Sequence, residues 1–157
     1  LERVQVDTIP GMWIWGIGGA VGAFGIGRVL DKVDSSRKLT TIIIVLLAAD
    51  FVLLLLFPSS RMVALVCLFA WGLLGWSSMA PQQHSMLSAN PDEGATAVAA
   101  NASANYLGSA VGSAVGGLLL PSSTGILLGA LFVVLLGIFC SIGARALSFP
   151  KPSDNEN

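Results

Sequence analysis

Long apolar stretches alternate with short polar breaks along this chain. The breaks read DKVDSSRK, PSSR, SANPDEG and PSST, and all are built from residues that favour turns. The apolar stretches are roughly 20 residues or longer, which is the length that a helix needs to cross a hydrocarbon core of about 30 Å. We therefore predict five transmembrane helices, at about residues 10–29, 39–57, 62–87, 95–120 and 125–147.

The short breaks also predict how these helices are arranged. A short link between two helices makes them antiparallel neighbours, so the five spans should form a compact bundle. We predict an all-α, multi-pass transmembrane helical bundle over residues 1–148. Residues 149–157 are polar and contain proline, which favours a disordered cytoplasmic tail.

Composition excludes several classes of function. Hydrophobic residues make up 54% of the chain and charged residues 11%, whereas soluble domains carry about 25% charged residues. A net charge of −1 gives no indication of a nucleic-acid partner. No catalytic group of Ser, His and Asp and no set of metal ligands is present, so we expect neither an enzyme nor a metal or cofactor site. Cys67 and Cys140 lie inside apolar runs and are expected to be buried and reduced.

The positions of the positive charges predict the orientation. Lys and Arg accumulate in cytoplasmic loops. With five spans, six of these residues fall on one side and two on the other, which places the C-terminus in the cytoplasm. The N-terminal residues then lie outside the cell. We expect this arrangement if the chain is a fragment of a longer protein whose earlier spans are missing. The first side carries Arg28, Lys32, Arg37, Lys38, Arg145 and Lys151, and the second carries Arg3 and Arg61.

The predicted helices are of two kinds. The second and fifth are dominated by Leu, Ile, Val and Phe, which suit contact with lipid, so we expect them at the periphery. The first and fourth are rich in glycine, which lets two membrane helices approach closely. On a helical wheel these glycines form one face on each helix. The faces comprise Gly11, Gly18, Gly22 and Gly25 on the first helix, and Asn101, Asn105, Gly108, Gly112 and Gly116 on the fourth.

Polar residues in two spans are candidates for contact with a solute. Asn101 and Asn105 can donate and accept hydrogen bonds, so they should face the bundle interior, either as interhelical contacts or lining a hydrated cavity. In the third span, Pro81 should bend the helix and free a carbonyl near Gln82 and Gln83. Such a bend suits a solute pathway. Tyr106 is the further cavity candidate.

Two titratable residues are candidates for proton coupling. Asp50 is the one acid deep in a span, where a charge costs on the order of 3 kcal/mol, so it is either a proton carrier or a neutral structural residue. His84 could carry a proton, or it could be a solvated residue near the interface. Trp71 lies deep in the third span, as does Trp76, and both should pack in the core. Trp13 and Trp15 fit the aromatic belt at the membrane surface.

The segment GRVLDKVDSSRK, residues 27–38, resembles the loop motif of the major facilitator superfamily. That motif consists of a glycine, three further residues, an acidic residue and a basic residue, followed by a pair of basic residues. In this chain the basic pair lies two residues later than is usual in the family. The segment from Ala80 to Gly117 looks like the tenth and eleventh helices of bacterial drug or sugar efflux members, proton antiporters of the arabinose-efflux type. The matching motif residues are Gly27, Asp31, Lys32, Arg37 and Lys38.

The resemblance implies that this chain is helices eight to twelve of a twelve-helix transporter in the cell (inner) membrane. The eighth and eleventh helices would meet the missing N-terminal half, and the ninth and twelfth would lie outside. The partners would be the lipid bilayer, a small-molecule substrate and protons, and Asp31 would act in a cytoplasmic latch between the halves. The alternative is a small scaffold subunit that does not transport and whose glycine faces bind partner helices.

Overall fold

A computed structural model describes residues 8–33, 35–89, 91–119 and 122–146, and every regular element in these ranges is an α-helix, as predicted. The predicted tail at 149–157 lies outside the described residues. The helices are α1 (Thr8–Leu30), α2 (Ser36–Leu56), α3 (Arg61–Ser77), α4 (Met79–Ala89), α5 (Gly94–Leu119) and α6 (Ser123–Ala146).

Short polar residues begin two of the helices. The Ser35 hydroxyl accepts a hydrogen bond from the backbone N–H of Lys38 at the start of α2, and Ser60 caps Val63 in the same way at the start of α3. Each cap satisfies a backbone donor that has no partner within its helix. The polar breaks in the sequence therefore mark true helix starts.

The third predicted span, 62–87, is confirmed as one apolar stretch, Arg61–Ala89, which a single residue divides into α3 and α4. The break lies at Ser78, whose hydroxyl donates to the carbonyl of Gly75 (2.7 Å). Pro81 follows in the first turn of α4, where its missing N–H is tolerated, and it is fully buried. The bend expected at the proline therefore occurs three residues before it.

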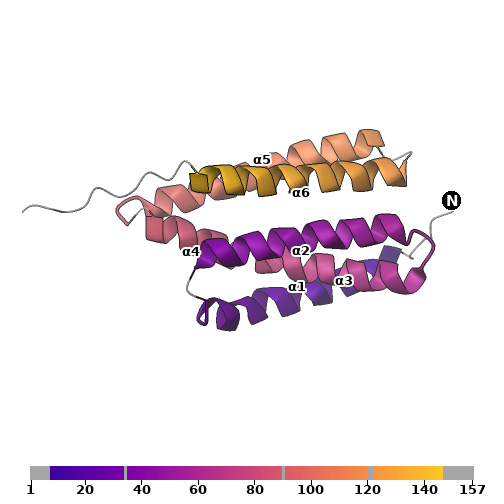
Figure 1. Ribbon diagram of the computed structural model, residues 1–157, viewed down its shortest axis with the longest axis horizontal. Helices are drawn as coiled ribbons and strands as arrows, with labels where there is room; N and C mark the ends of the chain where they lie inside the picture. Colours follow the sequence, from indigo (N-terminus) through magenta and orange to yellow (C-terminus); the bar gives the residue numbers. More distant parts are fainter. Residues whose placement is uncertain (1–7, 34, 90, 120–121, 147–157) are drawn as a thin grey trace, which may run out of the picture.

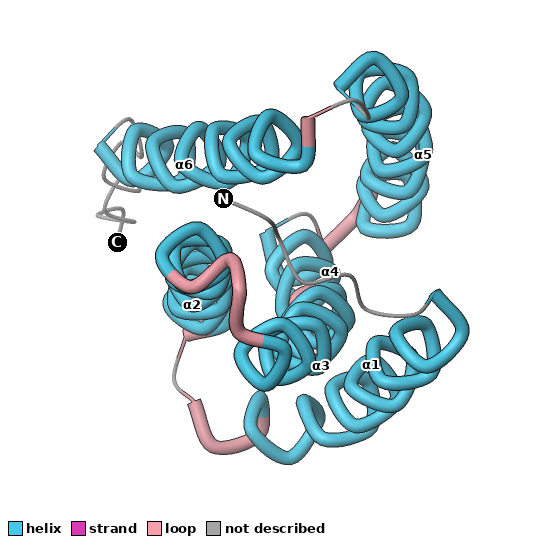
Figure 2. The backbone as a smooth tube through the Cα atoms, turned by 90° about the vertical axis from the view of Figure 1, so that its right-hand side faces the viewer, coloured by secondary structure: helices cyan, strands magenta, loops and turns pink. Residues whose placement is uncertain are grey.

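The helices run along the long axis of the molecule, and their connections alternate between its two ends, except that α4 continues directly from α3 (Figure 1). Figure 2 looks along the bundle and shows α3 between α1 and α2, with α6 beside α2 and α5 at the side of α4. One end of the bundle holds the α1–α2 and α4–α5 connections. The other end holds the α2–α3 and α5–α6 connections.

The position of α2 differs from the prediction. It was expected at the periphery because of its Leu and Ile content, but it contacts α3, α4 and α6. A small buried cluster of Ile26, Leu39 and Ile43 joins it to α1, with Leu74 of α3 packed against that cluster. Composition reports how apolar a helix is and does not distinguish contact with lipid from contact with other helices.

Three of the predicted spans are long and apolar enough to cross a membrane: Ile9–Leu30, Ser36–Leu56 and Arg61–Ala89. The apolar part of α6 that is described, Thr124–Cys140, is shorter, and α5 is not among the candidates because Gly, Ser and Asn lower its hydropathy. Large apolar side chains cover the outside of the bundle, including Phe24 (83% exposed) and Leu118 (82%). Such a surface is typical of contact with lipid. The protein is an all-α membrane helical bundle.

Candidate functional site

The tightest helix contact joins α1 to α3 through glycines. A Cβ atom on Gly18 would meet the backbone carbonyl oxygen of Phe69, and one on Gly22 would meet that of Leu73. From the other side, a Cβ on Gly72 would meet the carbonyl oxygen of Trp15. The two backbones touch directly at these positions, as small residues allow in membrane helices. By contrast, Gly25 meets nothing within 4 Å.

Aromatic rings surround this contact. Trp15 of α1 lies 6.1 Å from Trp71 and 6.3 Å from Trp76 of α3, measured between ring centroids, and Phe51 of α2 lies 6.3 Å from Trp71. Trp15 was expected in an interfacial belt together with Trp13, but it packs between helices. Trp13 is 70% exposed. The two residues differ because they point to opposite sides of α1.

Asp50 of α2 faces α3. Its side chain is 8% exposed, and Oδ2 has no hydrogen-bond partner among the residues that the structure describes. Cys67 of α3 is fully buried beside it, and its thiol donates to the Asp50 backbone carbonyl with 3.8 Å between Sγ and O. The acid therefore lies inside the bundle, although its helix was expected to face lipid. Cys140, expected to be buried, is exposed on α6.

A polar pocket of about 290 Å³ lies between the start of α2 and α4. Ser36 Oγ and His84 Nδ1 are 2.8 Å apart and form a hydrogen bond across it. The hydroxyls of Ser85 and Ser88 donate to carbonyls of their own helix, so they leave lone pairs toward the pocket. His84 is therefore solvent-exposed and hydrogen-bonded to α2.

The loop-motif residues lie at the same end of the bundle. The N–H of Asp31 donates to the carbonyl of Gly27 (3.0 Å), so the motif begins as an extension of the last turn of α1. The side chains of Asp31, Lys32 and Lys38 are exposed. Arg37 is also exposed, and it lines the polar pocket. Of the motif residues, Arg37 therefore shares the polar pocket with His84.

The amides proposed for a solute path do not come together in this chain. Gln82 is half-buried and Gln83 exposed, both on α4. On α5, Asn101 is half-buried, whereas Asn105 and Tyr106 (79%) are exposed. None of these five side chains lines the polar pocket beside His84 or the apolar pocket on α1.

The glycine face of α5 is equally open. A Cβ atom on Gly108, Gly112 or Gly116 would meet nothing within 4 Å. This helix touches only α4 and α6 among the described elements to any extent, and the α6 contact is slight. The face that carries the amides and glycines is therefore uncovered.

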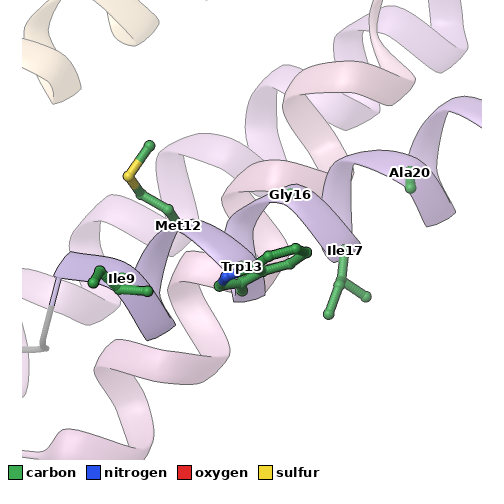
Figure 3. A pocket seen from close by; sticks show the side chains of 6 residues that line it. All are labelled: Ile9, Met12, Trp13, Gly16, Ile17 and Ala20. Atoms are coloured by element: carbon green, nitrogen blue, oxygen red, sulfur yellow. The ribbon is translucent and has the colours of Figure 1, made fainter.

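An open apolar pocket of about 540 Å³ lies on the outer face of α1. Figure 3 shows that its lining comes from this single helix, with Trp13 and Ile17 prominent. A surface formed by one helix and almost free of polar atoms suits lipid or another helix better than a polar solute.

Sequence reasoning missed two of these features. The hydrogen bond between Ser36 and His84 joins residues 48 positions apart, and the Asp50–Cys67 contact joins residues 17 positions apart. Both depend on how the helices are rotated, which hydropathy does not reveal. The sequence did contain a signal for the Asp50–Cys67 contact. Both residues interrupt apolar runs, and they lie on adjacent antiparallel helices.

Comparison with known proteins identifies the family of this chain. No solved structure matches it. The family described as the Major Facilitator Superfamily matches residues 5–113, which include the loop motif, the α1–α3 contact, Asp50 and most of α5. Because this match covers more than half of the sequence, the chain belongs to the major facilitator superfamily, a family of membrane transporters.

Proposed function

We propose that this chain is part of a secondary active transporter that exports a small molecule, a drug or a sugar, in exchange for protons. Family membership supports the transporter class. The resemblance of the segment from Ala80 to Gly117 to efflux antiporters supports export and proton coupling. In such folds two halves rock around a site near the middle of the membrane and expose it to each side in turn.

The observation that carries this proposal is the uncovered face of α5. Small residues and amides in a membrane helix normally serve close contact with another helix. In this chain Gly108, Gly112 and Gly116 meet no neighbour. The face is therefore available for an N-terminal half of the transporter, and the chain would contribute the C-terminal half without its first helix.

The solute would then pass along this contact between halves. Asn101 and Asn105 lie on the α5 face, and Tyr106 is next to it. Gln82 and Gln83 would contribute from α4. Gln83, Asn105 and Tyr106 are exposed in this chain, which fits residues that are enclosed only when the other half is present.

The loop motif would act at the cytoplasmic surface of the inner membrane. Asp31 and Lys32 are exposed at the end of α1, where an acid can pair with a base of the other half and separate when the halves move. The alternative of a scaffold subunit has less support, because the family consists of transporters.

Accumulation assays test the proposal. The full-length gene product, expressed in cells that lack their main efflux systems, should lower the accumulation of some member of a drug and sugar panel. A protonophore should abolish the difference, because the proton gradient supplies the free energy.

Two acids provide a matched comparison for this assay. Asp31→Asn should reduce export because it removes the latch carboxylate, whereas Asp92→Asn, at an exposed position in the α4–α5 connection, should leave it unchanged. If no solute on the panel responds to the gradient, the antiporter proposal is wrong.

A further inference from the structure

Asp50 is a buried acid whose environment leaves one oxygen unsatisfied. It is more than nine-tenths buried, and Oδ2 has no hydrogen-bond partner among the described residues. The cost of burying a polar atom without a partner is about 1–3 kcal/mol, and it is larger for an ionised group. A group retained at this cost needs an explanation beyond packing.

The described surroundings of the carboxyl supply no compensating positive charge. A charged carboxylate within a membrane span costs on the order of 3 kcal/mol unless it is paired. Of the titratable groups on helices packed against α2, Cys67 of α3 is the one in contact among the described residues, and it supplies no positive charge. Binding a proton at Oδ2 removes the charge and turns the unsatisfied acceptor into a hydroxyl.

Other charged and titratable groups on the neighbouring helices lie elsewhere. Arg61 begins α3, six positions before Cys67, which is about 9 Å along the helix axis. His84 of α4 is bonded to Ser36 at the opposite end of α2. On α6, Cys140 and Arg145 belong to the second half of the helix, which leads toward that same opposite end.

The depth of Asp50 favours exchange with one side of the membrane. It lies 14 positions after Ser36 and 6 before Leu56, or about 21 Å and 9 Å along the axis of α2. In the proposed orientation the nearer end is the external one. About two helical turns therefore separate the carboxyl from the side on which an export antiporter takes up its protons.

We propose that Asp50, enclosed by α2 and α3 beside Cys67, is a reversible proton-binding site that serves the coupling of the transporter. Its carboxylate accepts a proton from external water at Oδ2, and the site changes from −1 to neutral. The same O–H bond breaks when the proton is later released to water on the other side. This inference rests on the proposed antiport for its role in coupling, but proton binding itself does not.

Infrared difference spectroscopy of the purified full-length protein in lipid tests the site with the proton itself as the probe. Lowering the pH should produce the carbonyl stretch of a protonated carboxylic acid in a nonpolar environment. Asp50→Asn should lose this band, and Asp92→Asn, which replaces an exposed acid, should keep it. Asp50→Glu should keep a titrating band at a shifted frequency, so the site is testable even if the Asn variant does not assemble.

Transport measured on the same proteins separates the two proposals. Asp50→Asn should lose gradient-driven export while retaining exchange of the solute at equal concentrations on both sides. A band that is present at every pH, or one that survives in Asp50→Asn, would overturn the proton site. The wild-type protein could also show the expected band but no gradient-driven flux. That result would contradict the antiporter proposal and still support the proton-binding site.

Discussion

At the residue scale, the α1–α3 contact depends on positions that lack a side chain. Gly22→Ala would place a methyl group against the carbonyl oxygen of Leu73 and beside the Ser77 hydroxyl (2.8 Å). Overpacking of this kind costs about 1–3 kcal/mol. We expect a lower thermal midpoint for the full-length protein in detergent, measured by loss of the monodisperse peak after heating.

Gly25→Ala is the matched control, because it lies on the same helix and its new methyl group meets nothing within 4 Å. We expect this variant to be neutral or slightly stabilising, since alanine favours a helix more than glycine does. Equal losses for the two variants would show that the glycines matter for helix conformation and not for contact.

The sequence singled out candidate site residues but did not predict their contacts. Asp50 is conspicuous in any hydropathy reading, because an acid interrupts an apolar run. Its burial against Cys67 was not predicted, since that depends on the rotation of α2 about its axis. For the same reason Trp15 was assigned to the membrane surface although it packs against Trp71 and Trp76.

At the element scale, α5 offers a test of the uncovered face. Gly112→Leu would fill the groove formed with Gly108 and Gly116, and it should block export or assembly with the other half if that half occupies the face. Because nothing in this chain lies within 4 Å of Gly112, the fold of the chain itself should not change. Export assays and expression level of the full-length protein measure the two effects.

The control on the same helix is Ala114→Leu, which adds a similar volume about 160° away on the helical wheel. Ala114 is exposed as well. We expect export to persist in this variant. If both variants export normally, the α5 face has no role in contact with another half.

Helix positions were predicted within a few residues, because about 20 apolar residues between turn formers admit few alternatives. A bend in the third span was predicted at Pro81, but the interruption lies at Ser78. The proline removes one backbone donor, and the helix is interrupted one turn earlier, at Ser78. There the Ser78 hydroxyl donates a hydrogen bond to a carbonyl of α3. The bend therefore has a sequence signal, whereas its exact position depends on a side-chain hydrogen bond.

At the scale of the whole molecule, the distribution of basic residues predicts which end faces the cytoplasm. Cysteine labelling can test this in a full-length protein with Cys67 and Cys140 replaced by serine. Ser59→Cys, in the α2–α3 connection, should react with a membrane-impermeant maleimide added to intact cells. Asp92→Cys, in the α4–α5 connection at the opposite end, should react only after the membrane is opened. The reverse pattern would invert the proposed orientation and remove the external access assigned to Asp50.

The pairing of α1 with α3 also has a consequence for biosynthesis. The residues that meet in this contact are far apart in the chain: Leu73 lies 51 positions after Gly22, which it contacts. At about 5–20 residues per second, α1 waits roughly 3–10 s for its partner to be made. During that interval its glycine face lies against lipid or the insertion machinery, and Asp50 of α2 reaches the membrane before Cys67 of α3 can pack beside it. The bundle therefore closes only when α3 arrives, and a ribosome that stalls between these helices leaves both unprotected surfaces open to the cell's quality control.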